Sequence, residues 1–202
     1  MSRRGNNWRS CAMAALVAAA LLAAWAPSCL AGAMDEVESN LAGDNIASGL
    51  AAHARGDHDG AIARYTAAIS SNVLDKENLA IAYNNRGNAW DDKGDLARAL
   101  ADYDQAIKTN PSFAEAYYNR ALARHRLGRF QEALRDYDRL LTLDPYLASG
   151  YFNRSFAWAA LGRYDKAVGD VEKALEISPG NKKYMDQLRD WKAAQANPPQ
   201  AR

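Results

Sequence analysis

Hydrophobic and small residues recur at helical spacing along most of the chain, and this pattern itself repeats every 34 residues. Three segments align without gaps, and in each of them apolar positions lie on both sides of a single glycine. Two amphipathic helices separated by a turn produce this arrangement. The pattern therefore predicts three helical hairpins, which we call the second, third and fourth units, over 80–113, 114–147 and 148–181.

A less regular copy precedes them over 42–79, and we call it the first unit. Four extra residues lie in its junction with the second unit, around Asn72 to Asn78, and Val73 stands where the other units have proline. One hairpin cannot bury its own apolar faces, so hairpins of this kind stack into a continuous core. We therefore predict an all-α fold, a right-handed α-solenoid of about four helix pairs, with a capping helix over 182–196.

Glycine and charged residues recur in register. A glycine ends the first helix of every unit, where the left-handed backbone costs glycine little; these are Gly56, Gly94, Gly128 and Gly162. An arginine precedes an aspartate by 16 residues in three units, as Arg86 with Asp102, Arg120 with Asp136 and Arg154 with Asp170. The first unit has Ser48 and Arg64 at these places, so both partners are missing together. We expect each pair to bridge the two helices of its unit; the alternative is independent surface charges.

These motifs resemble the tetratricopeptide repeat family, in the bacterial variety marked by Asn-Arg-Gly and Asp-Tyr. The second unit carries both motifs intact, as Asn85-Arg86-Gly87 and Asp102-Tyr103. The resemblance covers Ala42 to about Trp191. Ala121 and Ser155 replace the motif glycine and Val171 replaces the tyrosine, which suggests looser packing at these places.

The resemblance also implies a concave groove, lined by the first helix of each unit, that holds a peptide or protein partner. Its inward positions in this chain are Asn84, Asn88, Asp91, Glu115, Tyr118, Leu122, His125, Arg126, Phe152 and Phe156. Exposed aromatic residues in such a groove would anchor an interface; the alternative is that they pack against a neighbouring helix. The family's clamp for a terminal carboxylate is not expected, because other residues occupy its positions, namely Ile46, Leu50, Glu115 and Ser149.

Composition and motifs argue against other classes of function. The chain is 49% hydrophobic and 24% charged, which fits a folded protein, and its net charge of +1 is too small for nucleic-acid binding. No spacing typical of a catalytic site, metal site or cofactor loop is present. Asp57-His58-Asp59-Gly60 imitates the start of a calcium loop but suits a turn, and His53 and His58, five residues apart, would not share a helical face. We therefore predict no catalytic residue, no metal and no cofactor.

The first 33 residues have the order of a secretory signal peptide: arginines, an apolar stretch from Cys11 to Ala26, and the small residues Ala31-Gly32-Ala33. We expect cleavage after Ala33 and a periplasmic or secreted product that does not insert into a membrane; the alternative is an uncleaved membrane anchor. Residues 34–41 would lead into the first unit, and 197–202 would form a flexible tail.

The predicted function is a non-catalytic interaction module, a scaffold or adaptor that binds a peptide or protein in its groove in the bacterial envelope. Two alternatives remain open at this point. The chain would form a homo-oligomer as a structural protein, or it would serve as an accessory subunit of an envelope enzyme. The sequence does not identify the partner.

Overall fold

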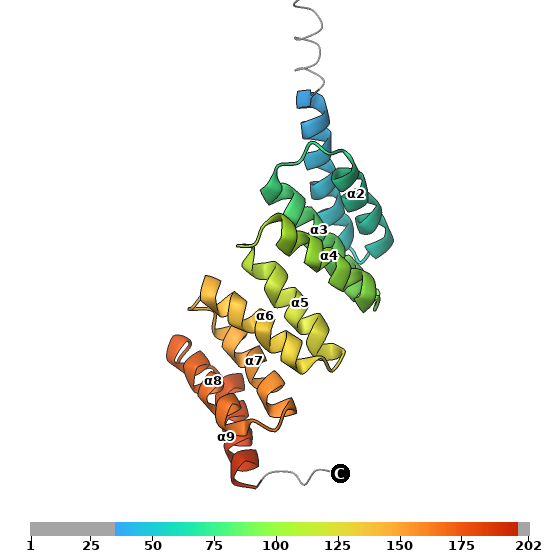
Figure 1. The fold of residues 1–202 in the computed structure, drawn as a ribbon. Helices are drawn as coiled ribbons and strands as arrows, with labels where there is room; N and C mark the ends of the chain where they lie inside the picture. Colours follow the sequence, from blue (N-terminus) through green and yellow to red (C-terminus); the bar gives the residue numbers. More distant parts are fainter. Residues whose placement is uncertain (1–34, 198–202) are drawn as a thin grey trace, which may run out of the picture.

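A computed structural model describes residues 35–197, and the regular structure within this range is helical (Figure 1). The predicted signal peptide and the last five residues of the predicted tail lie outside it. An N-terminal helix occupies 35–54. It is followed by α2 (His58–Ser70), α3 (Lys76–Asp92), α4 (Leu96–Thr109), α5 (Ala114–Arg126), α6 (Phe130–Leu143), α7 (Ala148–Ala160), α8 (Tyr164–Ile177) and α9 (Lys182–Ala196).

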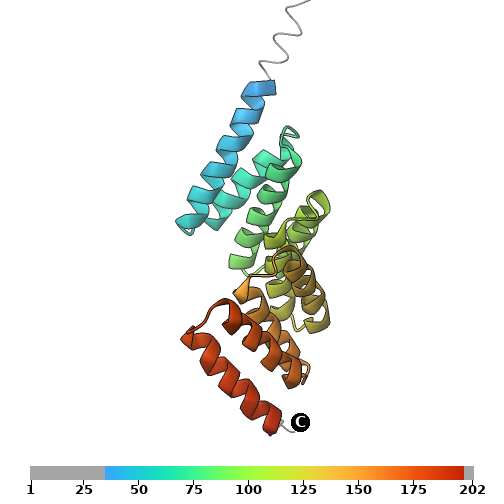
Figure 2. The same cartoon turned by 90° about the vertical axis from the view of Figure 1, so that its left-hand side faces the viewer.

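The helices stack in pairs along one long axis, with the N-terminal helix at one end and α9 at the other (Figures 1 and 2). Each helix from α2 onward packs against the next one in the chain. The first helices of neighbouring units also touch, α3 with α5 and α5 with α7, so they form the inner layer of the stack. This arrangement confirms the predicted all-α solenoid.

The turn between the two helices of each unit depends on its glycine. In all four units this glycine has a positive φ, between 71° and 79°. At Gly94 the turn is closed by two backbone hydrogen bonds, from Gly94 N–H to the Asp91 carbonyl (2.8 Å) and from Asp95 N–H to the Trp90 carbonyl (2.9 Å). A side chain at this φ would be strained. The predicted left-handed helix end is confirmed.

The four extra residues of the first junction lengthen a helix. Helix α3 has 17 residues, whereas α5 and α7 have 13 each. The chain leaves α2 through Asn72, whose φ of 59° is left-handed, and Asp75 then caps α3 by accepting a hydrogen bond from Asn78 N–H (2.7 Å). The insertion therefore adds about one turn to the start of α3 and leaves the 34-residue spacing of the following units unchanged.

The three arginine–aspartate pairs bridge the helices of their units, as predicted. Arg86 donates from Nε and Nη2 to the two carboxylate oxygens of Asp102, at 2.8 and 2.7 Å, and the third and fourth units repeat this two-bond geometry. The three aspartates are at most 6% exposed. The hydrogen bond to Asp102 raises the pKa of the Arg86 guanidinium. Each pair is thus a buried, two-bond contact rather than a pair of surface charges.

Each arginine also reaches back to the preceding unit. Nη1 of Arg120 donates to Asp104 on α4 (2.6 Å), and Nη1 of Arg154 donates to Asp138 on α6 (2.7 Å). At the junction with the first unit, Nη1 of Arg86 donates instead to the Thr66 hydroxyl on α2 (3.0 Å). The arginines therefore form a ladder that joins second helices across units as well as helices within a unit.

Close helix packing explains the motif glycine and its replacements. A Cβ on Gly87 would lie 2.7 Å from the ring of Tyr103, so glycine lets α3 and α4 approach closely. The fourth unit has Ser155 and Val171 at these two places, and both are fully buried. The Ser155 hydroxyl accepts a hydrogen bond from the Trp191 indole of α9 (3.2 Å). In this unit a smaller partner thus accompanies the larger serine, and an additional helix covers it.

Candidate functional site: the inner groove

The predicted groove residues do not form one continuous open surface. Asn84 is 1% exposed and Phe152 is 3% exposed, so neither side chain is free to contact a partner. The other eight are half-buried or exposed, and Glu115 and Arg126 are the exposed ones. The groove therefore has a closed part and an open part. A position is closed where a neighbouring helix packs over it.

Helix α9 closes the groove at the fourth unit. The ring of Phe152 lies 4.5 Å from that of Tyr184, and the ring of Phe156 meets that of Trp191 edge-on at 5.4 Å. Leu188 of α9 packs against the same cluster, so the predicted apolar face of α9 covers it. Of the two alternatives for these phenylalanines, packing against a neighbouring helix is the observed one. The groove assignment required Phe152 to be an exposed anchor, and its burial contradicts that requirement.

Side-chain amides connect the inner helices. Asn84 donates to the Glu115 carboxylate (3.0 Å) and accepts from the amide of Asn119 (3.0 Å). One unit further on, Asn153 donates to the hydroxyl of Tyr118 (2.7 Å). These contacts explain why Asn84 is buried. They also position the ring of Tyr118, which is half-buried, as is that of Phe156.

An open cavity of about 350 Å³ lies beside Tyr118, where the third and fourth units meet. Leu147 and Tyr118 contribute apolar surface to it, Leu140 lies behind them at 1% exposure, and the lining also includes two acidic residues, Glu115 and Asp144. The full lining is Ala114, Glu115, Tyr118, Leu140, Asp144, Leu147 and Ser149. A concave apolar surface with a few polar groups is the usual form of a binding site.

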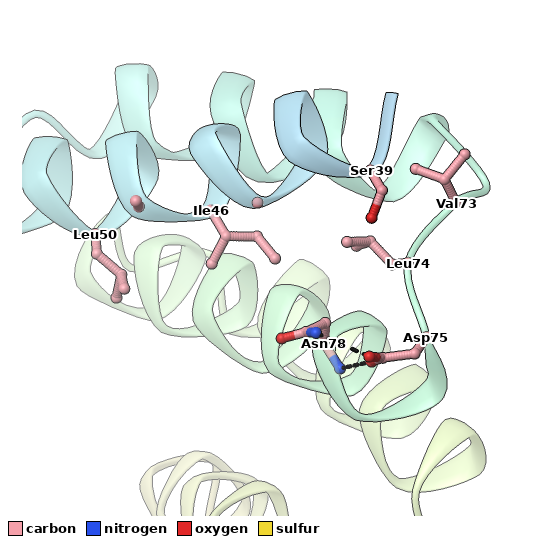
Figure 3. Close-up of a pocket in the computed structure, with 9 residues that line it drawn as sticks. Ser39, Ile46, Leu50, Val73, Leu74, Asp75 and Asn78 are labelled. Atoms are coloured by element: carbon pink, nitrogen blue, oxygen red, sulfur yellow. Dashed lines mark hydrogen bonds between the residues drawn. The ribbon is translucent and has the colours of Figure 1, made fainter. Parts of the chain in front are cut away.

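A second cavity, of about 380 Å³, lies at the same kind of position between the N-terminal helix and α3 (Figure 3). Ile46 and Leu50 reach it from the N-terminal helix, and Val73 and Leu74 reach it from the junction. Leu50 is 48% exposed, so part of this apolar surface is open to solvent. The groove prediction missed this apolar surface, because it treated Ile46 and Leu50 only as residues that exclude a carboxylate clamp.

The remaining predicted residues form the far edge of the groove, at the end of α3 and α5. Asn88 accepts a hydrogen bond from the Tyr103 hydroxyl (2.9 Å), and Asp91 pairs with Arg126 across the two units. His125 packs edge-on against Phe130, with ring centroids 5.1 Å apart, and burial lowers its pKa. Leu122 is half-buried on the same helix. The Asp91–Arg126 pair joins α3 to α5, whereas the contacts of Asn88 and His125 are made to α4 and α6. His125 Nε2 is buried and has no hydrogen-bond partner among the described residues.

The turn of the first unit differs from its sequence interpretation. Asp57 caps α2 by accepting from Gly60 N–H (2.9 Å), so Asp57 ends the inter-helix turn, whereas His58–Gly60 already form the first turn of α2. His53 and His58 do not share a helical face, yet the turn between them brings their rings within 5.4 Å of each other. The prediction that they do not share a helical face therefore holds, but it considered only a continuous helix and did not foresee that the turn brings the two rings together.

Among the described residues, no helix combines the length and the apolar character needed to cross a membrane.

Comparison with known proteins agrees with the repeat pattern and the helix stack. Two tetratricopeptide repeat models match, one over 46–103 and 84–148 and the other over 148–181. The chain belongs to the tetratricopeptide repeat family. This family generally provides non-catalytic scaffolds for protein–protein interaction. No curated protein sequence matches the chain.

Solved structures of the family align over most of the described residues. The crystal structure of MamA aligns with a TM-score of 0.67 and 23% sequence identity. The alignment covers 73% of this chain and 84% of the MamA chain. The first repeat domain of Spaghetti (RPAP3), bound to the HSP90 peptide SRMEEVD, has a TM-score of 0.57 and 27% identity and covers 61% of this chain and 96% of its own. The second repeat domain of human RPAP3, in complex with the HSP70 peptide SGPTIEEVD, is 30% identical to this chain and has a TM-score of 0.54. The alignment covers 56% of this chain and 94% of that domain.

Proposed function

We propose that this tetratricopeptide repeat protein is a non-catalytic scaffold that binds a peptide or protein partner in the open part of its inner groove. The observation that carries the proposal is the contrast along the groove. Helix α9 covers Phe152 and Phe156, whereas the cavity beside Tyr118 stays open. Two neighbours of the same fold hold peptides, which supports a peptide or protein as the ligand here.

The chemistry of the cavity favours a partner with an apolar side chain and a positive charge next to it. Leu147 and the ring of Tyr118, both half-buried, offer apolar contact, and the carboxylates of Glu115 and Asp144 attract a lysine or arginine. The peptides in the RPAP3 complexes end in the acidic sequence EEVD. Acidic side chains at this edge, and leucine and isoleucine at the clamp positions of the first unit, disfavour such a ligand. The partner is therefore of a different class from those peptides.

The proposal places this binding in the bacterial envelope. Its support is the order of residues in the first 33 positions, with Arg3, Arg4 and Arg9 before an apolar stretch and a small-residue run. Mass determination of the protein recovered from its own cells tests this step. A mature N-terminus at Met34 supports export with cleavage after Ala33, and an intact N-terminal segment contradicts it.

Site-specific crosslinking tests the groove. Ser149 lines the open cavity, and Gln105 is exposed on the outer helix α4. A photoreactive benzoylphenylalanine at Ser149 should capture a discrete partner from an envelope extract of the source organism, while the same group at Gln105 should not. Replacing Tyr118 with alanine should weaken binding of the captured partner at least about tenfold, as expected for an aromatic anchor.

Two controls make this result specific. The circular dichroism spectrum of Tyr118→Ala must match that of the parent protein, since Tyr118 also accepts a hydrogen bond from Asn153. A charge reversal at the cavity edge, Glu115→Lys, should weaken the same partner if it carries a basic residue. Equal capture from Ser149 and Gln105, or unchanged affinity in Tyr118→Ala, would show that the partner does not bind in the groove.

A further inference from the structure

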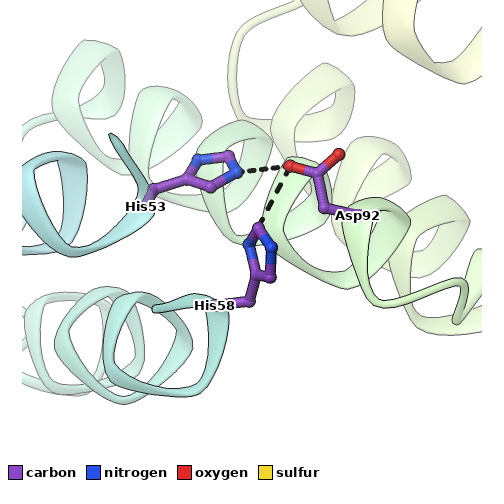
Figure 4. A group of neighbouring side chains, drawn as sticks. All are labelled: His53, His58 and Asp92. Carbon is purple, nitrogen blue, oxygen red and sulfur yellow. Dashed lines mark hydrogen bonds and ion pairs between the residues drawn. The ribbon is translucent and has the colours of Figure 1, made fainter. Parts of the chain in front are cut away.

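Two histidines and an aspartate meet where the first unit contacts the second, outside the two groove cavities (Figure 4). His53 lies in the last turn of the N-terminal helix, His58 is the first residue of α2, and Asp92 is the last residue of α3. One ligand atom from each residue lies within 4.8 Å of the other two. The three side chains therefore come from three helices and point at one volume.

The turn of the first unit creates this meeting. The N–H of Gly56 donates to the His53 carbonyl (2.9 Å), and the positive φ of Gly56 reverses the chain so that His58 returns toward His53. Asp57 holds the start of α2 by accepting from Gly60 N–H (2.9 Å). These hydrogen bonds hold the backbone from which both histidine side chains project.

Hydrogen bonding within the protein satisfies only one of the two histidines. His53 Nε2 lies 2.6 Å from Asp92 Oδ2, which is a normal hydrogen bond. His58 Nδ1 lies 4.0 Å from the same oxygen; it is buried and has no hydrogen-bond partner among the described residues. A buried ring nitrogen without a partner is costly, and each such group requires an explanation. Here the nitrogen faces a carboxylate and a second imidazole.

We propose that His53, His58 and Asp92 form a binding site for a divalent transition-metal ion, with Zn²⁺ as the representative ion. Two imidazole nitrogens and one carboxylate oxygen are a donor set that Zn²⁺, Co²⁺, Ni²⁺ and Cu²⁺ accept, whereas Ca²⁺ and Mg²⁺ prefer oxygen alone. In a tetrahedral zinc site neighbouring donor atoms lie about 3.3 Å apart. The distances from the Asp92 oxygen to the nitrogens of His53 and His58, 2.6 and 4.0 Å, lie on either side of this value, so small side-chain movements suffice.

The surrounding charges are compatible with a cation. Lys93, which follows Asp92 in the chain, pairs with Asp59 and is thereby drawn away from the Asp92 carboxylate. The Asp92 side chain is 53% exposed, so an ion has access from solvent. Three protein ligands leave one coordination position for water or for a ligand from a partner. The bound ion would link both helices of the first unit to the second unit, at the one junction where the arginine ladder contacts a threonine.

Metal titration of the full chain tests the site. Cys11 and Cys29 are potential metal ligands outside the described residues, so both are replaced with serine in every preparation, and no histidine tag is used. Calorimetry with Zn²⁺ should show one ion per chain, and Co²⁺ should give a visible absorption band typical of tetrahedral coordination. Zn²⁺ should also raise the melting temperature.

Three variants and one control decide the assignment. His58→Gln is the sharpest variant, because it removes no hydrogen bond found in the described part of the protein. This variant should bind Zn²⁺ at least about tenfold more weakly, and His53→Gln and Asp92→Asn should do the same. His125→Gln, which changes the third histidine of the chain, should bind like the parent.

Either of two results overturns the proposal: no saturable Zn²⁺ binding at micromolar concentrations, or equal binding in the parent and in His58→Gln. Circular dichroism of each variant shows that the helices remain folded, so that weaker binding reflects the loss of a ligand. A Zn²⁺-dependent rise in melting temperature that persists in His58→Gln would place the ion elsewhere and would likewise overturn the assignment.

Discussion

The first unit and the three units after it have the same helical hairpin but are held together differently. In the later units a partly buried arginine joins the two helices through a buried aspartate and reaches the preceding unit as well. The first unit has Ser48 and Arg64 at the two places, and Arg64 is exposed. Its packing rests on a small apolar cluster around Ile46, Ala61 and Tyr65. The same backbone architecture therefore does not require the charged pair.

The comparison shows what the pair adds to a repeat. Packing of alanine and tyrosine is sufficient to form the hairpin, since Ala61 and Tyr65 are fully buried although no ion pair joins the two helices of the first unit within residues 35–70. The arginine adds directional contacts that fix a helix relative to its own unit and to the neighbouring one. We therefore expect the later units to depend on these charges and the first unit to be insensitive to them.

The largest expected effect comes from Asp136, which is 3% exposed and accepts hydrogen bonds from both Arg120 and Arg124, each with a contact of 2.6 Å. Asp136→Ala leaves two guanidinium groups without their buried partner and should lower the free energy of unfolding by about 3–5 kcal/mol. Arg64→Ala, the matched change in the first unit, should alter it by at most about 0.5 kcal/mol. Urea denaturation followed by circular dichroism measures both.

A double-mutant cycle shows whether the contact itself is responsible. Arg120→Ala combined with Asp136→Ala should cost less than the sum of the single changes, with a coupling of about 1–3 kcal/mol. Additive effects would mean that the two residues act as independent charges, and the distinction between the units would lose its basis.

The difference between units also shows how far the sequence can predict this molecule. The glycine turns and the pairs such as Arg86 with Asp102 were predictable, because their spacing lies within one hairpin and is fixed by helix geometry. The burial of Phe152 was not, because the repeat register shows which positions face inward but not that α9 folds back over them. The meeting of His53 with Asp92 was also hidden, since it depends on how one unit docks on the next.

Tyrosine provides an intermediate test of the same comparison. Tyr103 of the second unit is 1% exposed and donates its hydroxyl to Asn88 (2.9 Å). Tyr65, the corresponding residue of the first unit, is fully buried, and its hydroxyl has no hydrogen-bond partner within residues 35–197. Burial raises the pKa of Tyr65 to about 12. Tyr103→Phe should therefore destabilise the protein by about 1 kcal/mol, and Tyr65→Phe should stabilise it by up to about 1 kcal/mol.

The measurement is again the free energy of unfolding, which should fall in Tyr103→Phe and rise in Tyr65→Phe. Loss of stability in Tyr65→Phe equal to that in Tyr103→Phe would contradict the structure of the first unit, because it would require a hydrogen bond that the described residues do not provide. Absorbance at 295 nm during alkaline titration gives a second check. The Tyr65 phenol should ionise only near pH 12, and the amplitude that titrates there should fall in Tyr65→Phe.

The smallest expected effect comes from adding the missing charge to the first unit. Arg86 donates to the Thr66 hydroxyl at 3.0 Å, at the place where the later units present Asp104 and Asp138. Those two aspartates are 54% and 58% exposed, so solvent screens the attraction, and Thr66→Asp should stabilise the protein by only about 0.2–1 kcal/mol. Asp104→Thr should cost a similar amount. Both effects on the free energy of unfolding should vanish in 1 M NaCl, where the Debye length is only about 3 Å. A gain in Thr66→Asp that does not depend on salt would have to come from helix propensity. The ladder would then contribute nothing to joining the units.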